Sequence, residues 1–212
     1  MKYFIFFTIS IVVLTSCGST KNISDKLSFS KKEKELILSG KATEPMRVLQ
    51  ITNLKDSITL RSKSTDIKAD IDDEVLQHFT KRLYETVRSP ATRGVGIAAP
   101  QVGVLKNIIW VKRLDKEDEP FEVYFNPEIK KYSEMKQDVM EGCLSIPNVR
   151  ENSGKRSYAI FLVYEDKNGK QKCEMVEAFT AVIFQHEIDH LSGIMFTDHL
   201  EKEIKKSIKH GL

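Results

Sequence analysis

The sequence predicts an α+β domain, because helical and extended patterns occupy different parts of the chain. Apolar residues recur at helical spacing within residues 72–88 and again near the C-terminus, within residues 178–191. Between these segments lie short β-branched and aromatic runs separated by turn signals. Helices at both ends of a series of strands are typical of an α+β domain with antiparallel strands and hairpins.

Length and composition indicate one ordinary domain with short extensions. The chain has 212 residues, of which 41% are hydrophobic and 30% charged, as in soluble globular proteins. Its formal net charge of +3 gives no reason to propose a nucleic-acid partner. Three cysteines, Cys17, Cys143 and Cys173, are too few for a disulfide scaffold, so each needs its own explanation.

Residues 1–16 are predicted to be a lipoprotein signal peptide. Lys2 provides the positive charge, and the apolar run at residues 4–14 is too short to span a bilayer as a stable helix. The run ends in Leu-Thr-Ser-Cys, which resembles the lipobox of bacterial lipoproteins, whose cysteine receives lipid and becomes the first mature residue. We therefore expect lipidation of Cys17 and anchoring to a membrane of the bacterial cell envelope. An ordinary cleaved signal and a buried N-terminal strand are the alternatives.

Residues 17–44 are predicted to form a tether, with the lipidated cysteine at its start. This segment is polar and rich in serine and lysine, and only residues 33–38 show a weak helical pattern. The folded domain is expected to cover residues 45–212, with a first strand at residues 48–51.

Within the domain, the first long helix is predicted at residues 72–88 and is stopped by Pro90. Asn168-Gly169 is a strong hairpin signal between two of the predicted strands. The last helix covers residues 178–191, with Gly193 just past its end. The predicted strands after the first are residues 107–111, 121–125, 158–164 and 172–176.

The last helix contains the pattern H-E-x-x-H. His186 and His190 are one helical turn apart, so their imidazoles can share one metal ion. Glu187 would then lie beside the open position of the metal, where it can take a proton from bound water. A helix with two surface histidines is the structural alternative, because this pattern also occurs by chance.

A hydrolytic metal site normally has three protein ligands, so a third is needed. Phe196 occupies the position where one protease class has a third histidine, and Glu201 and Glu203 are too near for the glutamate of another class. Upstream, Glu-Gly-Cys-Leu-Ser offers Cys143, and a thiolate with two imidazoles suits zinc or ferrous iron. A buried, packing cysteine is the alternative.

Residues 94–101 read Gly-Val-Gly-Ile-Ala-Ala-Pro-Gln. Their small residues let a backbone approach a ligand closely. No lysine follows and no helix is predicted to open there, so the segment is a poor match to a phosphate-binding loop. A simple turn is also compatible with this composition.

In this order, the three motifs resemble the signature motifs of peptide deformylases. The resemblance covers residues 45–200 and includes Leu60-Arg61 and the segment 147–150. It implies the peptide-deformylase-like fold and a metal-dependent enzyme that hydrolyses the N-formyl group of N-formylmethionyl peptides, releasing formate. It also implies Fe²⁺ as the divalent ion, with Zn²⁺ or Ni²⁺ as alternatives. We expect a monomer.

The resemblance assigns a role to each matching residue. Cys143, His186 and His190 hold the metal, and Glu187 is the catalytic carboxylate. The side chain of Gln101 and the backbone N–H of Leu144 stabilise the oxyanion. Substrate-binding positions are Val95, Gly96 and Arg150.

Three alternatives remain open. Translation could start at Met46 and give a cytoplasmic enzyme acting on nascent chains. The chain could instead be a non-catalytic, peptide-binding lipoprotein, although intact Glu187 and Gln101 argue against this. A third possibility is a structural lipoprotein in which Cys143 and Cys173 form a disulfide.

Overall fold

The computed structural model describes residues 27–200, apart from the side chains of residues 153 and 154. The predicted first long helix is α4 (Glu74–Arg88), which begins after Asp73 because that side chain accepts hydrogen bonds from two backbone N–H groups of the first turn. The predicted last helix is α5 (Ala178–Leu191). Both helix predictions are confirmed.

Five antiparallel strands form the main sheet in the order β1-β2-β3-β6-β7. The four strands predicted after the first correspond to β2, β3, β6 and β7, although the predictions at residues 107 and 158 start one residue before β2 and β6. The predicted hairpin joins β6 to β7, and Gly169 takes the positive φ of 71° that its turn requires. The strand bounds are β1 (Gly96–Ala98), β2 (Ile108–Lys112), β3 (Phe121–Tyr132), β6 (Ala159–Glu165) and β7 (Gln171–Glu177).

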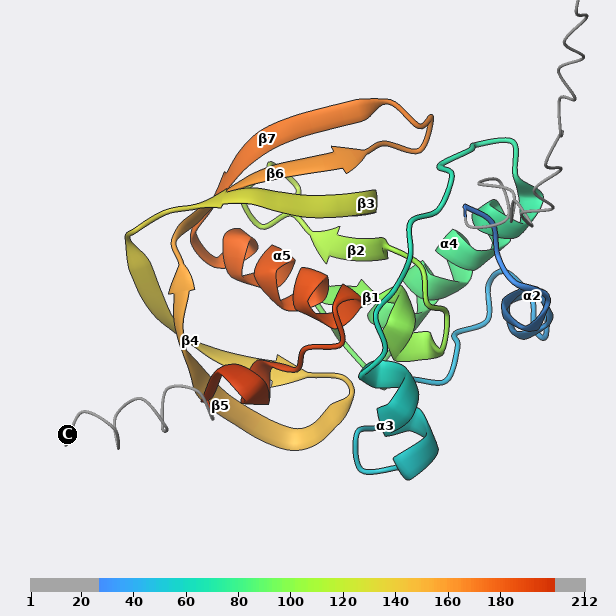
Figure 1. The fold of residues 1–212 in the computed structure, drawn as a ribbon, viewed down its shortest axis with the longest axis horizontal. Coiled ribbons are helices and arrows are strands. Elements are labelled where there is room, and N and C mark those ends of the chain that lie inside the picture. Colours follow the sequence, from blue (N-terminus) through green and yellow to red (C-terminus); the bar gives the residue numbers. More distant parts are fainter. Residues whose placement is uncertain (1–26, 201–212) are drawn as a thin grey trace, which may run out of the picture.

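A second sheet consists of β4 (Lys136–Cys143) and β5 (Ile146–Ser157), which pair with each other. Helix α5 lies between this hairpin and the five-stranded sheet (Figure 1). Most of α5 is therefore buried, including Thr180 to Glu187 and His190. This position brings the end of the helix beside the end of β4.

The predicted strand at residues 48–51 is wrong, because these residues pair with no strand. The N–H of Leu49 donates to the carbonyl of Gln101 at 2.8 Å, and the N–H of Ile51 donates to the carbonyl of Ser145 at 2.9 Å. Gln101 lies in the 3₁₀ helix η1 (Ala99–Val102), whereas Ser145 lies in the turn between β4 and β5. The segment bridges two loops instead of joining a sheet, and the short helix α3 (Leu54–Leu60) follows it.

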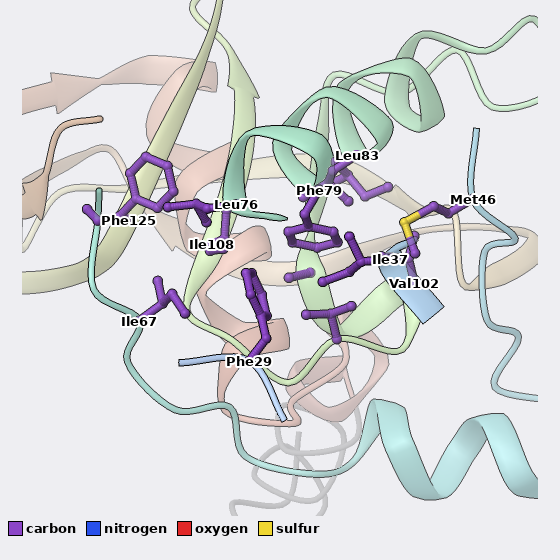
Figure 2. Packing of buried hydrophobic residues seen from close by; sticks show 14 of the residues in the cluster. Phe29, Ile37, Met46, Ile67, Leu76, Phe79, Leu83, Val102, Ile108 and Phe125 are labelled. Carbon is purple, nitrogen blue, oxygen red and sulfur yellow. The ribbon is translucent and has the colours of Figure 1, made fainter. Parts of the chain in front are cut away.

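The predicted tether is wrong for its described part, residues 27–44. Helix α2 (Lys31–Ile37) forms there, with Ser30 and Glu33 as a reciprocal capping box. Phe29, Ile37 and Met46 are buried in the same hydrophobic cluster as four α4 side chains, three of which are labelled in Figure 2. The folded unit therefore begins before the predicted boundary at residue 45. Residues 1–26, with the predicted signal peptide and Cys17, lie outside the described part.

Polar contacts also join this N-terminal segment to the domain. The buried guanidinium of Arg82 in α4 donates to the carbonyls of Ile37 at 2.9 Å and Glu44 at 3.0 Å. A carboxylate oxygen of Glu33 accepts a hydrogen bond of 2.9 Å from the backbone N–H of Leu105. A buried arginine needs such partners, so these contacts make residues 27–46 part of the fold.

The core lies on both faces of the five-stranded sheet. One hydrophobic cluster fills the space between the sheet, α4 and the N-terminal segment, and the other lies between the sheet and α5. Within residues 27–200, no helix has both the length and the apolar character needed to cross a membrane.

Candidate metal centre and active site

Two histidines of α5 and one cysteine of β4 form a compact group of metal-binding atoms. His186 and His190 lie one turn apart, with ring centroids 5.0 Å from each other. The Sγ atom of Cys143 lies 3.2 Å from Nε2 of His190. One ligand atom from each of the three residues lies within 4.8 Å of the others. The structure thus brings together the three residues predicted to hold the metal.

The chemistry of these three side chains fits a divalent ion such as zinc or ferrous iron. Nδ1 of His186 lies 2.8 Å from a carboxylate oxygen of Glu141, which leaves Nε2 of the ring as the metal-binding atom. Burial raises the pKa of the Cys143 thiol, but positive charge on His190 and hydrogen bonds with both imidazoles lower it well below its usual value. Zinc binds both thiolate and imidazole, and three protein ligands leave the fourth position of a hydrolytic site for water.

Glu187 is placed beside this group by the close approach of strand β1. A Cβ atom added to Gly96 would lie 2.5 Å from Oε1 of Glu187, so any larger residue at this position of the strand would displace the carboxylate. Oε2 of Glu187 is buried and has no hydrogen-bond partner among the described residues. Burial also raises the pKa of this carboxyl to about 7. A buried carboxylate oxygen without a partner is suited to hold a water molecule or a proton.

Gln101 directs its amide N–H group at the metal-binding residues. Its Oε1 accepts a hydrogen bond of 2.9 Å from the backbone N–H of Ala98, which fixes the orientation of the amide. Nε2 then lies 3.6 Å from Sγ of Cys143 and 3.3 Å from Oγ of Ser145. Gln101 is only 1% exposed, so this donor acts in a site with little water.

The other predicted residues lie around the same site. Leu144 directly follows Cys143 in the turn from β4 to β5, and a Cβ atom added to Gly94 would lie 3.1 Å from its Cδ1. Val95 is 38% exposed, beside Gly96. Arg150 is exposed on β5, directly opposite Gly142 of β4. The three motifs therefore meet, with the small residues of the first motif against the metal-binding turn.

This architecture and the motifs match a known family. The family described as "Polypeptide deformylase" matches residues 48–206, which is most of the chain. This chain belongs to the peptide deformylase family. Residues 27–47 precede the match, although the side chains of Phe29, Ile37 and Met46 pack into the core of the deformylase domain.

Curated relatives and solved structures agree with this assignment. The peptide deformylase of Synechocystis sp. is 38% identical over 157 residues, covering 74% of this chain and 81% of the relative. The peptide deformylase of Desulforudis audaxviator is 41% identical over 153 residues, covering 72% of this chain and 94% of the relative. The crystal structure of the Thermotoga maritima peptide deformylase has a TM-score of 0.64 at 29% identity, covering 73% of this chain and 97% of the other.

A charged network behind the metal ligands of this deformylase was not predicted. Arg156 donates to both carboxylate oxygens of Glu141, at 2.8 and 2.9 Å, and to Asp189 at 2.7 Å. His199 in turn contacts Asp189 at 2.8 Å. Glu141 binds His186, so this network holds a metal ligand in orientation. Two members of this network lie inside the motifs: Glu141 precedes Gly-Cys, and Asp189 lies between the two histidines. Nothing local in the sequence indicates Arg156.

The predicted alternative of a disulfide is not supported. Cys143 and Cys173 both have free thiols in the structure. Cys173 is exposed on β7, where it pairs across the strands with Val163 of β6, away from the metal-binding turn. The structural-lipoprotein interpretation thereby loses the bond on which it was based.

Proposed function

We propose that this chain removes the formyl group from N-formylmethionyl peptides by metal-dependent hydrolysis, which is the activity of a peptide deformylase. One observation carries the proposal. Three metal ligands, a buried carboxylate without a partner and an oriented amide donor converge on one site from three separate segments. A peptide-binding module has no chemical need for the last two groups.

The metal, when bound, supplies Lewis acidity that lowers the pKa of water to about 7 and polarises a carbonyl group. Glu187 takes up the proton released from water at Oε2 and later delivers it to the departing amine. The amide Nε2 of Gln101 and the N–H of Leu144 donate hydrogen bonds to the formyl oxygen as it gains negative charge. Donors that are oriented before reaction do not have to reorganise as the charge develops.

We further propose that Val95, Gly96 and Arg150 bind the substrate peptide. Gly96 offers a strand backbone without a side chain, so an extended peptide can lie close to Glu187. Arg150 lies across the hairpin from Gly142, next to Cys143, and can pair with peptide carbonyl or carboxylate groups. A deformylase of Acinetobacter baumannii, 29% identical to this chain, has been crystallised with Met-Ala-Ser bound.

The direct test is release of formate from formyl-Met-Ala-Ser by the metal-loaded protein. We expect turnover, and the same peptide without its formyl group serves as the blank. Absence of formate from protein that carries one ion per chain would contradict the proposal and favour the peptide-binding lipoprotein. Metal analysis after anaerobic purification tests our assignment of Fe²⁺ as the native ion, with Zn²⁺ or Ni²⁺ as the competing results.

We also propose that the enzyme is a lipoprotein of the cell envelope, anchored through Cys17. The support is in the sequence: Lys2, the apolar run at residues 4–14 and the cysteine at its end. Since the folded unit includes Phe29, the spacer is shorter than the predicted tether. Ten peptide steps join Cys17 to Leu27, which span at most about 36 Å. The domain would then work close to the membrane, on formylated peptides outside the cytoplasm.

A cytoplasmic form that starts at Met46 is the competing account. Such a chain would lack Phe29 and Ile37, which are 4% and 0% exposed in the core. It would also leave donors of the buried Arg82 without the carbonyls of Ile37 and Glu44. The loss of buried side chains and of hydrogen bonds to a buried arginine would destabilise the shorter chain, which favours the longer one. The intact mass of the native protein tests the proposal: acylated Cys17 is expected at the N-terminus, and an unmodified chain from Met46 would refute it.

A further inference from the structure

The segment that resembles a strand in the sequence bridges the two loops that carry the oxyanion donors. Its backbone binds the carbonyl of Gln101 through Leu49 and the carbonyl of Ser145 through Ile51, at 2.8 and 2.9 Å. Between these two residues, Gln50 directs its side chain at the metal-binding turn. One short segment is therefore in contact with both walls of the oxyanion site.

The side-chain amide of Gln50 holds one particular peptide group. Its Nε2 donates to the carbonyl of Leu144 at 3.1 Å and to the carbonyl of Val48 at 3.3 Å. The N–H on the other side of the same peptide group, that of Ser145, donates to Sγ of Cys143 at 3.4 Å. The peptide group that joins Leu144 to Ser145 is thus bound on both sides. Leu144 lies between this held peptide group and Cys143, whose Sγ belongs to the metal-binding group, so the preceding peptide group, which carries the N–H of Leu144, has little freedom to change direction.

Gln50 is itself anchored. Its backbone N–H donates to Oδ2 of Asp56 at 2.9 Å. Asp56 is held by a two-pronged ion pair with Arg47, whose donor–acceptor distances are 2.8 and 2.7 Å. Asp56 lies in the first turn of α3, so the position of Gln50 is fixed to a helix. An anchored donor costs less entropy in holding its target than a mobile one.

We propose that Gln50 is a positioning residue that sets the direction of the Leu144 N–H toward the forming oxyanion. It touches neither the metal ligands nor the reacting atoms, and acts through the carbonyl of Leu144. The inference rests on the proposed deformylase function, because it assigns Leu144 N–H as an oxyanion donor. Donors of this kind accelerate a reaction only when they are oriented before charge develops.

Two variants test this role. Gln50→Met removes both donated hydrogen bonds while keeping the length of the side chain, and Gln50→Glu keeps the shape but places a carboxylate oxygen against the carbonyl of Leu144. We expect kcat for formyl-Met-Ala-Ser to fall about tenfold in Gln50→Met, the scale of one lost hydrogen bond, and further in Gln50→Glu. KM should stay within about twofold and metal content should not change, because substrate binding and the ligands are untouched.

Gln137 provides a matched control. Its amide also donates to two backbone carbonyls, those of Ala178 at 2.9 Å and Ser157 at 3.3 Å, and it is half-buried like Gln50. Gln137→Glu should lower the thermal unfolding midpoint without changing kcat. An equal fall of kcat in Gln50→Glu and Gln137→Glu would mean that lost stability lowers the activity, and it would contradict the positioning role. An unchanged kcat in Gln50→Met, or loss of metal from it, would overturn the proposal.

A measurement without turnover separates this inference from the proposed function. In the zinc-loaded protein, hydrogen exchange at the Ser145 amide should quicken about tenfold in Gln50→Met and stay unchanged in Gln137→Glu. If the wild-type enzyme releases no formate, the deformylase proposal fails, while this exchange rate still reports whether Gln50 holds the turn. Unchanged exchange at Ser145 in both Gln50 variants would refute the positioning role.

Discussion

At the scale of single residues, the chemistry depends on a buried carboxylate that has a free oxygen. Glu187→Gln keeps the size of the side chain and removes the base. We expect metal content near wild type and deformylation reduced by about 10²-fold or more, the scale of general acid–base catalysis. Formate release and metal analysis on the same sample are the measurements. Unchanged turnover would exclude Glu187 as the proton carrier.

The two described cysteines differ in what they contact, and this gives a second prediction. Cys143→Ser should lose most of the metal, since a hydroxyl is a poor ligand for a site that favours sulfur. Cys173→Ser changes an exposed side chain on β7 and should retain both metal and activity. The zinc-to-protein ratio after dialysis distinguishes the two variants. Equal loss from both would contradict the assigned ligand set.

The spacing of motif residues made the centre of the site predictable. H-E-x-x-H places two imidazoles on one helical face whatever the rest of the fold, so His186, His190 and Glu187 could be found in the sequence. Arg156 could not, because Glu141 meets it across the β4–β5 hairpin, which was not predicted, and Asp189 meets it only when β5 packs on α5. Gln50 was hidden for the same reason, since its partner Leu144 is far away in the chain.

At the scale of elements, helices and strands were predicted correctly where the apolar pattern or turn signal was strong. The predictions failed where tertiary contacts determine the structure of a segment. Helix α4 shows its apolar stripe and its cap in the sequence, and the β6–β7 turn shows Asn-Gly. Strands β4 and β5 were missed, because much of this hairpin is exposed and mixes charged with apolar residues. The sequence of the N-terminal segment suggests a tether because α2 is mostly charged and Ile37 is its one buried residue.

The N-terminal segment supplies the third prediction. Phe29→Ala should lower the free energy of unfolding by about 3–5 kcal/mol, because the ring is buried against Phe79 at a centroid distance of 5.7 Å. Leu38→Ala is the control, since Leu38 belongs to the same segment but is 54% exposed, and it should cost well under about 1 kcal/mol. Urea unfolding measures both. A segment that merely tethers the domain would show no difference between the variants.

At the scale of the whole molecule, arginine-paired carboxylates make the fold sensitive to acid. Hydrogen bonds from Arg47 and from the N–H of Gln50 lower the pKa of Asp56 to about 2, and the pKa of Asp115 is lowered by its hydrogen bond with Arg113. A carboxyl with a lowered pKa in the folded state stabilises the protein above its unfolded pKa, and this contribution disappears as the pH falls through the folded pKa.

The fourth prediction follows from that sign. The thermal unfolding midpoint should decrease as the pH is lowered from 4 to 2. Over this interval Asp56 is protonated in the unfolded chain, where its pKa is the ordinary 3.8, before it is protonated in the folded chain, where its pKa is about 2. Asp56→Asn should be less stable at pH 6 and should show a smaller fall over the same interval. Thermal unfolding of both proteins in matched buffers measures the difference. Parallel curves would mean that Asp56 carries no such linkage.

The contact between Gly96 and Glu187 has a consequence for resistance to inhibitors. A compound that lies along β1 at Gly96 touches a position where even one added methyl group would meet the catalytic carboxylate. A resistant mutant would have to exclude the compound there without displacing its own base, and a Cβ atom added at this position would already lie 2.5 Å from Oε1 of Glu187. Escape is expected instead at Val95, whose exposed side chain can change size without meeting buried atoms, at some cost in substrate binding. Inhibitors that depend on the backbone of Gly96 and avoid the side chain of Val95 should therefore select resistance slowly.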